Sequence, residues 1–196
     1  MTADRKPPNP ARRNQRSQQA ILTATADLLG EVSYTKLTVE AIAARAGVGK
    51  QTIYRWWPDK GALVLDAYLA LVGADQDLTV PDSGDLKADL RLVLGSLVDS
   101  LRDPVFEQRY RALLAAIQDD PKLAAALLER LLKPWLAATT QRLRAAQRAG
   151  QIGDVDLGVA AELLYGPVYY RWLLRTGPIS REYVDAVVAM TLRALT

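Results

Sequence analysis

The amino-acid sequence predicts an all-α protein of about nine helices, and three observations lead to that prediction. Several long segments repeat apolar residues at the i, i+3, i+4 and i+7 spacing of a helix face. Glycine, proline and N-cap residue types stand between these segments, and no segment shows the alternation of a β-strand. The chain has 196 residues, of which 49% are hydrophobic, so a packed core fits one large domain or two small ones.

The first segment, residues 1–13, is predicted to be a flexible basic arm because prolines stand among its basic residues (Pro7, Pro8 and Pro10). A helix is expected over 14–30, where three apolar residues form one stripe (Ile21, Ala24 and Leu28). Gly30 suits the C-terminal end of this helix.

Two short helices and a longer one are expected next. Thr38 is a good N-cap for the first, whose buried face consists of Val39, Ile42, Ala43 and Ala46. Gly47 can adopt the positive φ that a sharp turn between helices requires. The second helix starts near Gly49 or Lys50, buries Ile53 and Trp57, and stops at Pro58. Asp59 can cap a helix that continues to about Gly73.

A polar linker over residues 75–84 precedes five amphipathic helices, expected at about 85–102, 104–118, 121–149, 155–176 and 180–195. Pro104 and Pro121 occupy first-turn positions, where proline is tolerated. Pro134 and Pro167 are interior, so a kink or a break is expected at each.

Composition excludes several classes of function. The chain has no cysteine and no histidine, which removes disulfides, thiolate and imidazole metal sites and Ser-His-Asp triads. No apolar run approaches the ~18 residues of a membrane span. Residues 1–19 are polar and lack the apolar stretch of a signal peptide. We therefore expect a soluble cytoplasmic protein without a metal or cofactor.

Charge is unevenly distributed. Residues 1–60 contain ten lysines and arginines against five acidic residues, whereas the remainder of the chain nets −2. A basic N-terminal part indicates contact with a polyanion. A solvated charged tail is the alternative.

Residues 38–60 have the layout of a DNA-reading helix-turn-helix, in which the second helix enters the major groove N-terminus first. Lys50, Gln51 and Thr52 lie at that end, and their side chains suit guanine, adenine and the thymine methyl group respectively. Arg55 could reach a guanine edge or a phosphate. The remaining expected phosphate contacts are Thr38, Tyr54, Trp56 and Lys60.

Each of these assignments has an alternative. Lys50 and Arg55 could be ordinary solvated charges, and Trp56 could equally belong to the core. Trp57 is expected in the core, because bulky aromatic residues at helical spacing usually pack. The Gly47–Thr52 segment superficially resembles a phosphate-binding loop. That motif requires a glycine where this chain has Ala44, and it follows a strand, whereas a helix is expected before this segment.

Residues 14–60 resemble the DNA-binding domain of the TetR (tetracycline repressor) family. The resemblance rests on Thr38, Ala43–Val48, Thr52–Tyr54 and Trp57–Lys60. Where the family usually has a serine before the recognition helix and a glycine near its first turn, this chain has Gly49 and Gln51. Residues 164–172 are similar to one group of regulatory domains in that family.

The resemblance implies a helix-turn-helix DNA-binding domain over 14–60 and a ligand-binding and dimerisation domain over 61–196. The last two helices would pair with their mates as a four-helix bundle through the face Tyr183, Val184, Val187, Val188, Thr191 and Leu195; intrachain core is the alternative for that face. Pocket candidates are bulky or polar side chains on apolar helices: Tyr68, Phe106, Arg109, Tyr110, Gln118, Trp135, Tyr165 and Tyr169.

The function expected from these features is a ligand-responsive transcriptional regulator, a repressor that binds a near-palindromic DNA operator as a homodimer and is released by a small molecule. Two recognition helices would lie in successive major grooves about 34–36 Å apart. The alternatives are an architectural DNA binder, a DNA-processing enzyme and an enzyme acting on a small molecule in the C-terminal cavity. No catalytic constellation marks the C-terminal helices, where Asp119 and Asp120 suit turn and cap chemistry.

Overall fold

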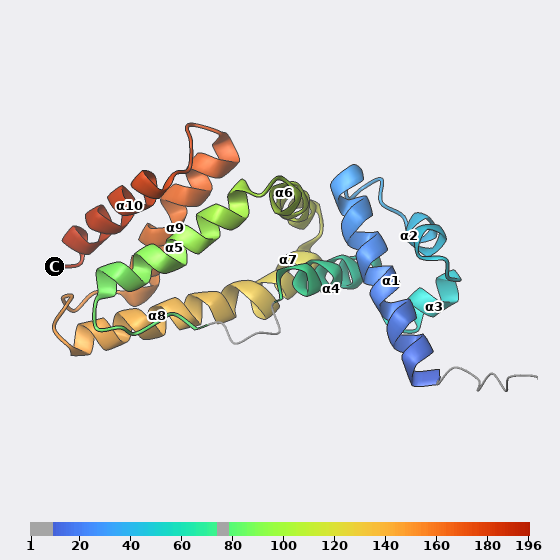
Figure 1. The fold of residues 1–196 in the computed structure, drawn as a ribbon, viewed down its shortest axis with the longest axis horizontal. Coiled ribbons are helices and arrows are strands. Elements are labelled where there is room, and N and C mark those ends of the chain that lie inside the picture. The colour runs from blue at the N-terminus through green and yellow to red at the C-terminus, as the bar shows by residue number, and fades with distance from the viewer. Residues whose placement is uncertain (1–9, 74–78) are drawn as a thin grey trace, which may run out of the picture. The chain divides into compact units, whose positions relative to one another are not determined.

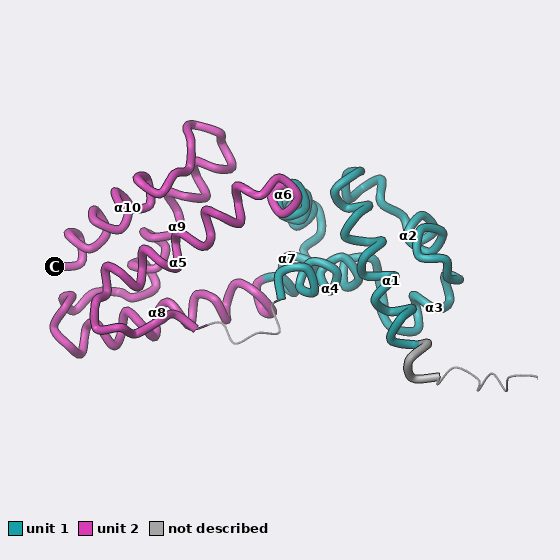
Figure 2. The backbone as a smooth tube through the Cα atoms, viewed as in Figure 1, with its two compact units in different colours: residues 1–75, 108–127 teal, residues 76–107, 128–196 magenta. Residues whose placement is uncertain are grey.

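The computed structural model describes residues 10–73 and 79–196, and every regular element in those ranges is a helix (Figure 1). The predicted all-α fold class is therefore confirmed. Contacts divide the chain into two compact units (Figure 2). Unit 1 consists of residues 1–75 and 108–127, and unit 2 consists of residues 76–107 and 128–196. The domains predicted from sequence, 14–60 and 61–196, remain a prediction.

Unit 1 contains α1 (Pro10–Glu31), α2 (Val39–Ala46), α3 (Lys50–Tyr54), α4 (Lys60–Val72), most of α6 (Pro104–Asp119) and α7 (Pro121–Leu127). Helix α1 packs against α2 and α4, and α4 also packs against α7. The core of this unit holds fully buried aliphatic side chains from six helices and the loop after α1 (Ile21, Leu29, Leu37, Ile42, Ile53, Leu63, Leu65, Leu113 and Leu123). Burial of these side chains is the main force that holds short helices such as α3 in place.

Unit 2 contains α5 (Leu86–Arg102), the start of α6, a π-helical turn η1 (Leu128–Leu132), α8 (Lys133–Arg148), α9 (Leu157–Leu174) and α10 (Arg181–Ala194). Helix α10 packs against both α5 and α9, and α8 packs against α9. If α7, η1 and α8 are counted as one interrupted helix, the described residues form nine helices, as the sequence predicted.

The two interior prolines behave differently. The expected helix over 121–149 contains the π-helical turn η1, which ends at Leu132, two residues before Pro134, and the chain stays helical from α7 through η1 to α8. Helix α9 continues through Pro167 without a break. Proline at 167 removes the N–H that would bond to the Leu163 carbonyl, and the Thr191 hydroxyl donates to that oxygen at 3.5 Å. A neighbouring helix thus supplies a donor where the helix itself has lost one.

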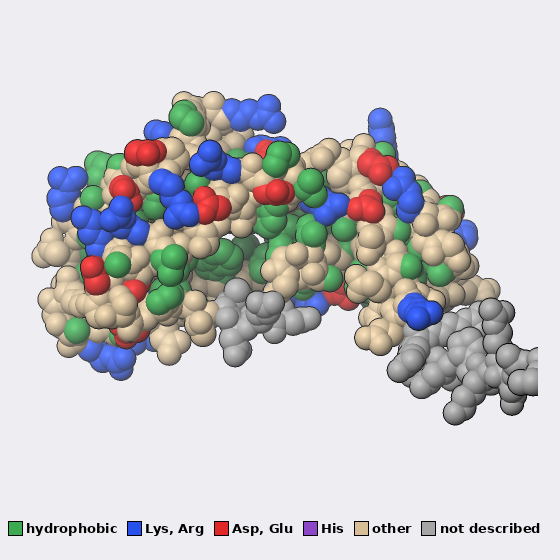
Figure 3. Space-filling model, viewed as in Figure 1, with side chains coloured by type: hydrophobic (Ala, Val, Ile, Leu, Met, Phe, Trp, Pro, Cys, Tyr) green, Lys and Arg blue, Asp and Glu red, His purple; other side chains and the backbone are tan. Residues whose placement is uncertain are grey.

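Helix α1 begins at Pro10 rather than near Asn14, since proline is tolerated at the first helical position. The predicted flexible arm otherwise lies outside the described residues. On the face seen in Figure 3, lysine and arginine side chains lie among aspartate and glutamate side chains. Among the helices that the structure describes, none has the length and hydropathy needed to cross a bilayer.

Candidate nucleic-acid interface and pocket

Local features of the chain build the turn between α2 and α3. Thr38 is the N-cap of α2, and its hydroxyl oxygen accepts a hydrogen bond from the Ala41 N–H at 3.1 Å. Gly47 adopts a φ of +66°, the left-handed conformation that favours glycine at the end of a helix. The Val48 N–H then donates to the Ala43 carbonyl at 3.0 Å. The predicted N-cap and turn glycine are confirmed.

Helix α3 separates buried side chains from exposed ones. Ile53 is buried, and so is Trp57 just beyond the helix, whose Nε1 donates to an Asp66 carboxylate oxygen at 2.7 Å. Thr52 and Trp56 are half-buried. The exposed side holds charged, amide and phenol groups (Lys50, Gln51, Tyr54 and Arg55). These groups offer the donors and acceptors that base edges and phosphates require, whereas Trp57 belongs to the core, as predicted.

The exposed cations of this helix have neighbours within the chain. Lys50 Nζ donates to a Glu40 carboxylate oxygen at 2.8 Å, which raises the pKa of Lys50 and lowers that of Glu40. The Arg55 guanidinium lies 5.0 Å from the centre of the Trp56 ring, within cation–π range. Both side chains remain exposed.

Lys60 has partners that the sequence did not reveal. The sequence suggested a phosphate for this lysine, since a cation in the first turn of a helix opposes the helix dipole. In the structure Nζ donates to the carbonyls of Tyr34 and Leu37 at 2.8 and 3.1 Å and lies 4.1 Å from the centre of the Tyr34 ring. An ammonium has three N–H donors, so one remains for a phosphate.

Tyr34 also links the loop after α1 to the start of α7, and sequence reasoning missed it. The Tyr34 hydroxyl donates to Asp120 at 2.6 Å, and Asp120 also caps α7 by accepting from the Leu123 N–H at 3.0 Å. Partial burial raises the pKa of Tyr34, and the bond to Asp120 raises it further. The hydrogen bond from Tyr34 lowers the pKa of Asp120. No local pattern relates residues 86 positions apart, so only the fold reveals this link.

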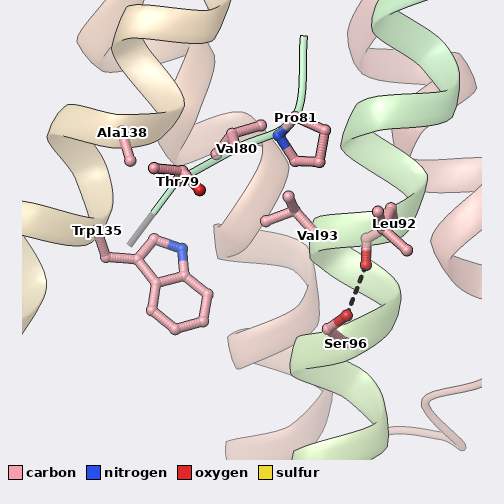
Figure 4. A pocket seen from close by; sticks show the side chains of 8 residues that line it. All are labelled: Thr79, Val80, Pro81, Leu92, Val93, Ser96, Trp135 and Ala138. Atoms are coloured by element: carbon pink, nitrogen blue, oxygen red, sulfur yellow. Dashed lines mark hydrogen bonds between the residues drawn. The ribbon is translucent and has the colours of Figure 1, made fainter. Parts of the chain in front are cut away.

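A pocket of about 260 Å³ lies in unit 2 between α5, α8 and the segment that precedes α5 (Figure 4). Trp135 and Ala138 of α8 line one side and Leu92, Val93 and Ser96 of α5 the other. Residues 79–81 complete the lining. None of these side chains is charged, and the Ser96 hydroxyl donates to the Leu92 carbonyl at 2.9 Å.

Hydrogen bonds through two hydroxyl groups hold the indole of Trp135. Its Nε1 donates to the Tyr165 hydroxyl at 2.6 Å, and that hydroxyl lies 2.6 Å from the Thr139 hydroxyl. Burial raises the pKa of Tyr165, and the bonds to Thr139 and Trp135 oppose this rise. The indole therefore has a defined orientation at the edge of the pocket.

Among the eight pocket candidates from sequence, Trp135 lines this pocket and Tyr165 supports it. Tyr68 and Tyr110 stack with ring centres 5.4 Å apart in the interior of unit 1. Arg109, half-buried in the same unit, pairs with Asp27 at 2.7 Å. The other three lie elsewhere: Phe106 is half-buried, Gln118 is exposed, and Tyr169 contacts Trp172 edge to face. In the described residues, no cluster of three or more acidic side chains offers a metal site.

The predicted dimer face of α10 is buried within the chain. Five residues of this face are at most 6% exposed: Val184, Val187, Val188, Thr191 and Leu195. The sixth, Tyr183, is half-buried, and its hydroxyl donates to the Pro167 carbonyl at 3.1 Å. This packing against α5 and α9 corresponds to the intrachain alternative that the sequence left open. Different apolar side chains of α9 and α10 are exposed (Val159, Leu163, Tyr170, Leu173, Leu174 and Met190).

Comparison with known proteins gives consistent matches. Residues 21–67 match the family described as "Bacterial regulatory proteins, tetR family", and residues 80–191 match "Tetracyclin repressor-like, C-terminal domain". The HTH-type transcriptional regulator YdeS of Bacillus subtilis (strain 168) is 33% identical over 180 residues, which cover 90% of this chain and 88% of that protein.

A DNA-binding transcriptional repressor TetR of Mycobacteroides abscessus is 27% identical over 187 residues, covering 93% of this chain and 95% of that protein. The crystal structure of the TetR family transcription regulator SCO0332 superposes with a TM-score of 0.71 at 35% identity, covering 92% of this chain and 98% of that one. The matches extend over both the helix-turn-helix and the C-terminal helices.

Proposed function

The chain belongs to the TetR family of helix-turn-helix transcriptional regulators, and from this membership we propose that it is a homodimeric repressor released from DNA by a small molecule. The family is one of regulators rather than enzymes, and the repressor named above is a relative over most of its length. The proposed place of action is the cytoplasm, where the DNA operator is found.

We propose residues 14–60 as the DNA-reading domain, and one observation carries this assignment. Helix α3 buries Ile53 and leaves Lys50, Gln51 and Arg55 exposed, so the polar side of the second helix is free to enter a major groove. Base contacts are assigned to Lys50, Gln51 and Thr52, and Arg55 contacts a base or a phosphate. Phosphate contacts are assigned to Thr38, Tyr54, Trp56 and Lys60.

Residues 61–196 are proposed to hold the effector and the dimer interface. Val159, Leu163 and Tyr170 follow a helical spacing on α9 and are each at least 44% exposed. Met190 of α10 is 65% exposed. Exposed apolar side chains on two neighbouring helices are typical of surfaces that pair with a second copy, and a symmetric dimer would present two recognition helices to a near-palindromic operator.

The proposed effector site is the pocket between α5 and α8. Because no charged side chain lines it, a charged effector would lose hydration without gaining a partner, so an uncharged and largely apolar molecule is favoured. The fixed Trp135 indole supplies a flat wall, and the Ser96 and Thr79 hydroxyls supply polar contacts. The effector would favour a conformation of the dimer with a different spacing between recognition helices.

The test is selection of binding sites from a randomised duplex library at several salt concentrations. The expected result is a near-palindromic site whose affinity falls steeply with salt, as phosphate contacts require. Binding of all duplexes with equal affinity would instead indicate an architectural DNA binder. Absence of binding at every salt concentration would contradict the assignment of α3.

A further inference from the structure

An ion pair joins the two helices of the helix-turn-helix at the surface proposed to face DNA. Glu40 lies in the first turn of α2, and Lys50 is the first residue of α3. Lys50 Nζ and Glu40 Oε1 are 2.8 Å apart, with side chains that are 53% and 63% exposed. A carboxylate is an unfavourable neighbour for a polyanion, so its presence among the proposed DNA contacts requires an explanation.

Stability does not supply that explanation. An ion pair between two exposed, flexible side chains contributes little, because water screens the attraction and ordering both side chains costs entropy. Glu40 does favour the N-terminus of α2 through the helix dipole. The same helix end, however, carries Thr38, which is proposed to bind a phosphate, so Glu40 competes there with DNA.

The other cations of the helix-turn-helix in the described residues have partners of several kinds. Arg45 pairs with Glu31 through two hydrogen bonds of 2.9 and 2.8 Å. Lys60 is bound to two backbone carbonyls, and Arg55 lies against the Trp56 ring. Lys50 thus combines a place at the leading end of α3 with a carboxylate partner.

The ion pair with Glu40 changes the binding free energy that Lys50 gains from contact with DNA. A lysine without a partner gains Coulomb energy from any phosphate that its flexible stem can reach. Lys50 must first break or share its ion pair with Glu40, so a contact with a phosphate alone adds little binding free energy. A guanine offers two acceptors, O6 and N7, which the remaining N–H groups can bond while one stays on Glu40.

On the premise that the proposed DNA-binding function holds, we propose that Glu40 is a specificity-determining residue. Its carboxylate pairs with the Lys50 ammonium, so this ammonium binds phosphates of arbitrary duplexes weakly but can still bond to a guanine base. Glu40 thereby lowers affinity for non-operator DNA more than affinity for the operator. The effect is one of discrimination between sequences, since Glu40 itself adds no attraction to DNA.

The experiment compares wild type with Glu40→Gln in the full-length protein, on the selected operator and on a scrambled duplex of equal length. Removing the carboxylate is expected to raise affinity for the scrambled duplex about threefold to tenfold, because Lys50 becomes available as an additional phosphate contact. The slope of log affinity against log salt should steepen by about one for that duplex. The ratio of operator to scrambled affinity should fall.

Two further variants separate this mechanism from a general charge effect. Glu129→Gln removes the exposed carboxylate that pairs with Lys133 on the first turn of α8, so it changes net charge equally and should leave the ratio unchanged. In the Lys50→Gln background, Glu40→Gln should no longer change the ratio of operator to scrambled affinity, since no ammonium is then released. A ratio that Glu40→Gln leaves unaltered, or an equal fall in the ratio in the Lys50→Gln background, would overturn the proposal. Wild type that binds no duplex would instead overturn the proposed function itself.

Discussion

Arg142 of α8 and Asp89 of α5 form an ion pair in the interior of unit 2, with 2.8 Å between Arg142 Nε and Asp89 Oδ2. The two side chains are 2% and 3% exposed. Asp89 also accepts hydrogen bonds from the Ser83 hydroxyl at 2.6 Å and from the Ser83 N–H. Ser83 follows the pocket-lining residues 79–81 closely in the chain, so the buried pair fixes the segment that leads into α5.

Removal of one partner from this pair should destabilise the protein strongly. Asp89→Ala leaves the buried Arg142 charge only the exposed Asp82 carboxylate, 3.4 Å from its Nε, and we expect a loss of about 3–5 kcal/mol in the free energy of unfolding. The double variant Asp89→Leu with Arg142→Met should recover most of that loss, because it removes both desolvated charges. Urea denaturation measures the free energy of unfolding of the single and the double variant. The exposed pair of Glu129 and Lys133 is the control, and Glu129→Gln should cost no more than about 1 kcal/mol.

Stability should also depend on pH through Asp89. Burial alone would raise the pKa of this carboxyl, but the hydrogen bonds from Ser83 and Arg142 outweigh it and hold the pKa below its usual value. The stabilisation is therefore present above the unfolded pKa of about 3.9 and is lost as pH falls through the lower folded pKa. Unfolding free energy measured between pH 6 and the acid range should fall less steeply in Asp89→Asn. Equal slopes would mean that Asp89 is not responsible.

The local part of this structure was predictable from sequence. Thr38, Gly47 and Asp59 each act on backbone groups within a few positions, so residue type and spacing suffice to identify two N-caps and a turn. The burial of Ile53 and Trp57 follows from helical spacing in the same way.

The long-range part was not predictable, because no local pattern records which residues meet. Lys60 is held by carbonyls of the α1–α2 loop, and Asp89 meets Arg142 across 53 positions. The apolar stripe of α10 was recognised, but periodicity does not reveal whether its partner lies in the same chain. Met190, on the other side of that helix, is exposed instead. The pocket likewise arises from α5, α8 and a preceding loop together.

The link between Tyr34 and Asp120 should contribute to the stability of unit 1. Tyr34→Phe keeps the ring against Lys60 but removes the hydroxyl that donates to Asp120, and we expect a loss of about 1–2 kcal/mol. Chemical denaturation, followed by the tryptophan fluorescence of the protein, measures this loss. Tyr54→Phe is the matched control, because Tyr54 is 54% exposed in the same unit and its substitution should have little effect on unfolding in the absence of DNA. If both variants unfold alike, the hydrogen bond contributes nothing.

Dimer formation should depend on the exposed apolar side chains of α9 and α10. Leu163→Glu together with Met190→Glu would bury two charges in a paired interface, so we expect monomers at micromolar concentration. Operator affinity should fall as well, since one recognition helix contacts only one half-site. Sedimentation velocity gives the assembly state. Val105→Glu changes an exposed apolar residue of α6, 53% exposed, and should leave the dimer intact. Unchanged assembly in the double variant would place the interface elsewhere.

Gln51 should specify one base pair of the operator. It is exposed at the second position of α3, and its amide can donate to adenine N7 and accept from adenine N6. Gln51→Ala should therefore weaken operator binding by about 1–3 kcal/mol, relax the preference at one position in each half-site, and leave the salt dependence unchanged. Arg55→Gln provides the contrast, because loss of a phosphate contact would reduce the salt slope by about one. Repeating the site selection with each variant measures both effects. A uniform loss of affinity across all sequences in Gln51→Ala would show that Gln51 contacts the backbone rather than a base.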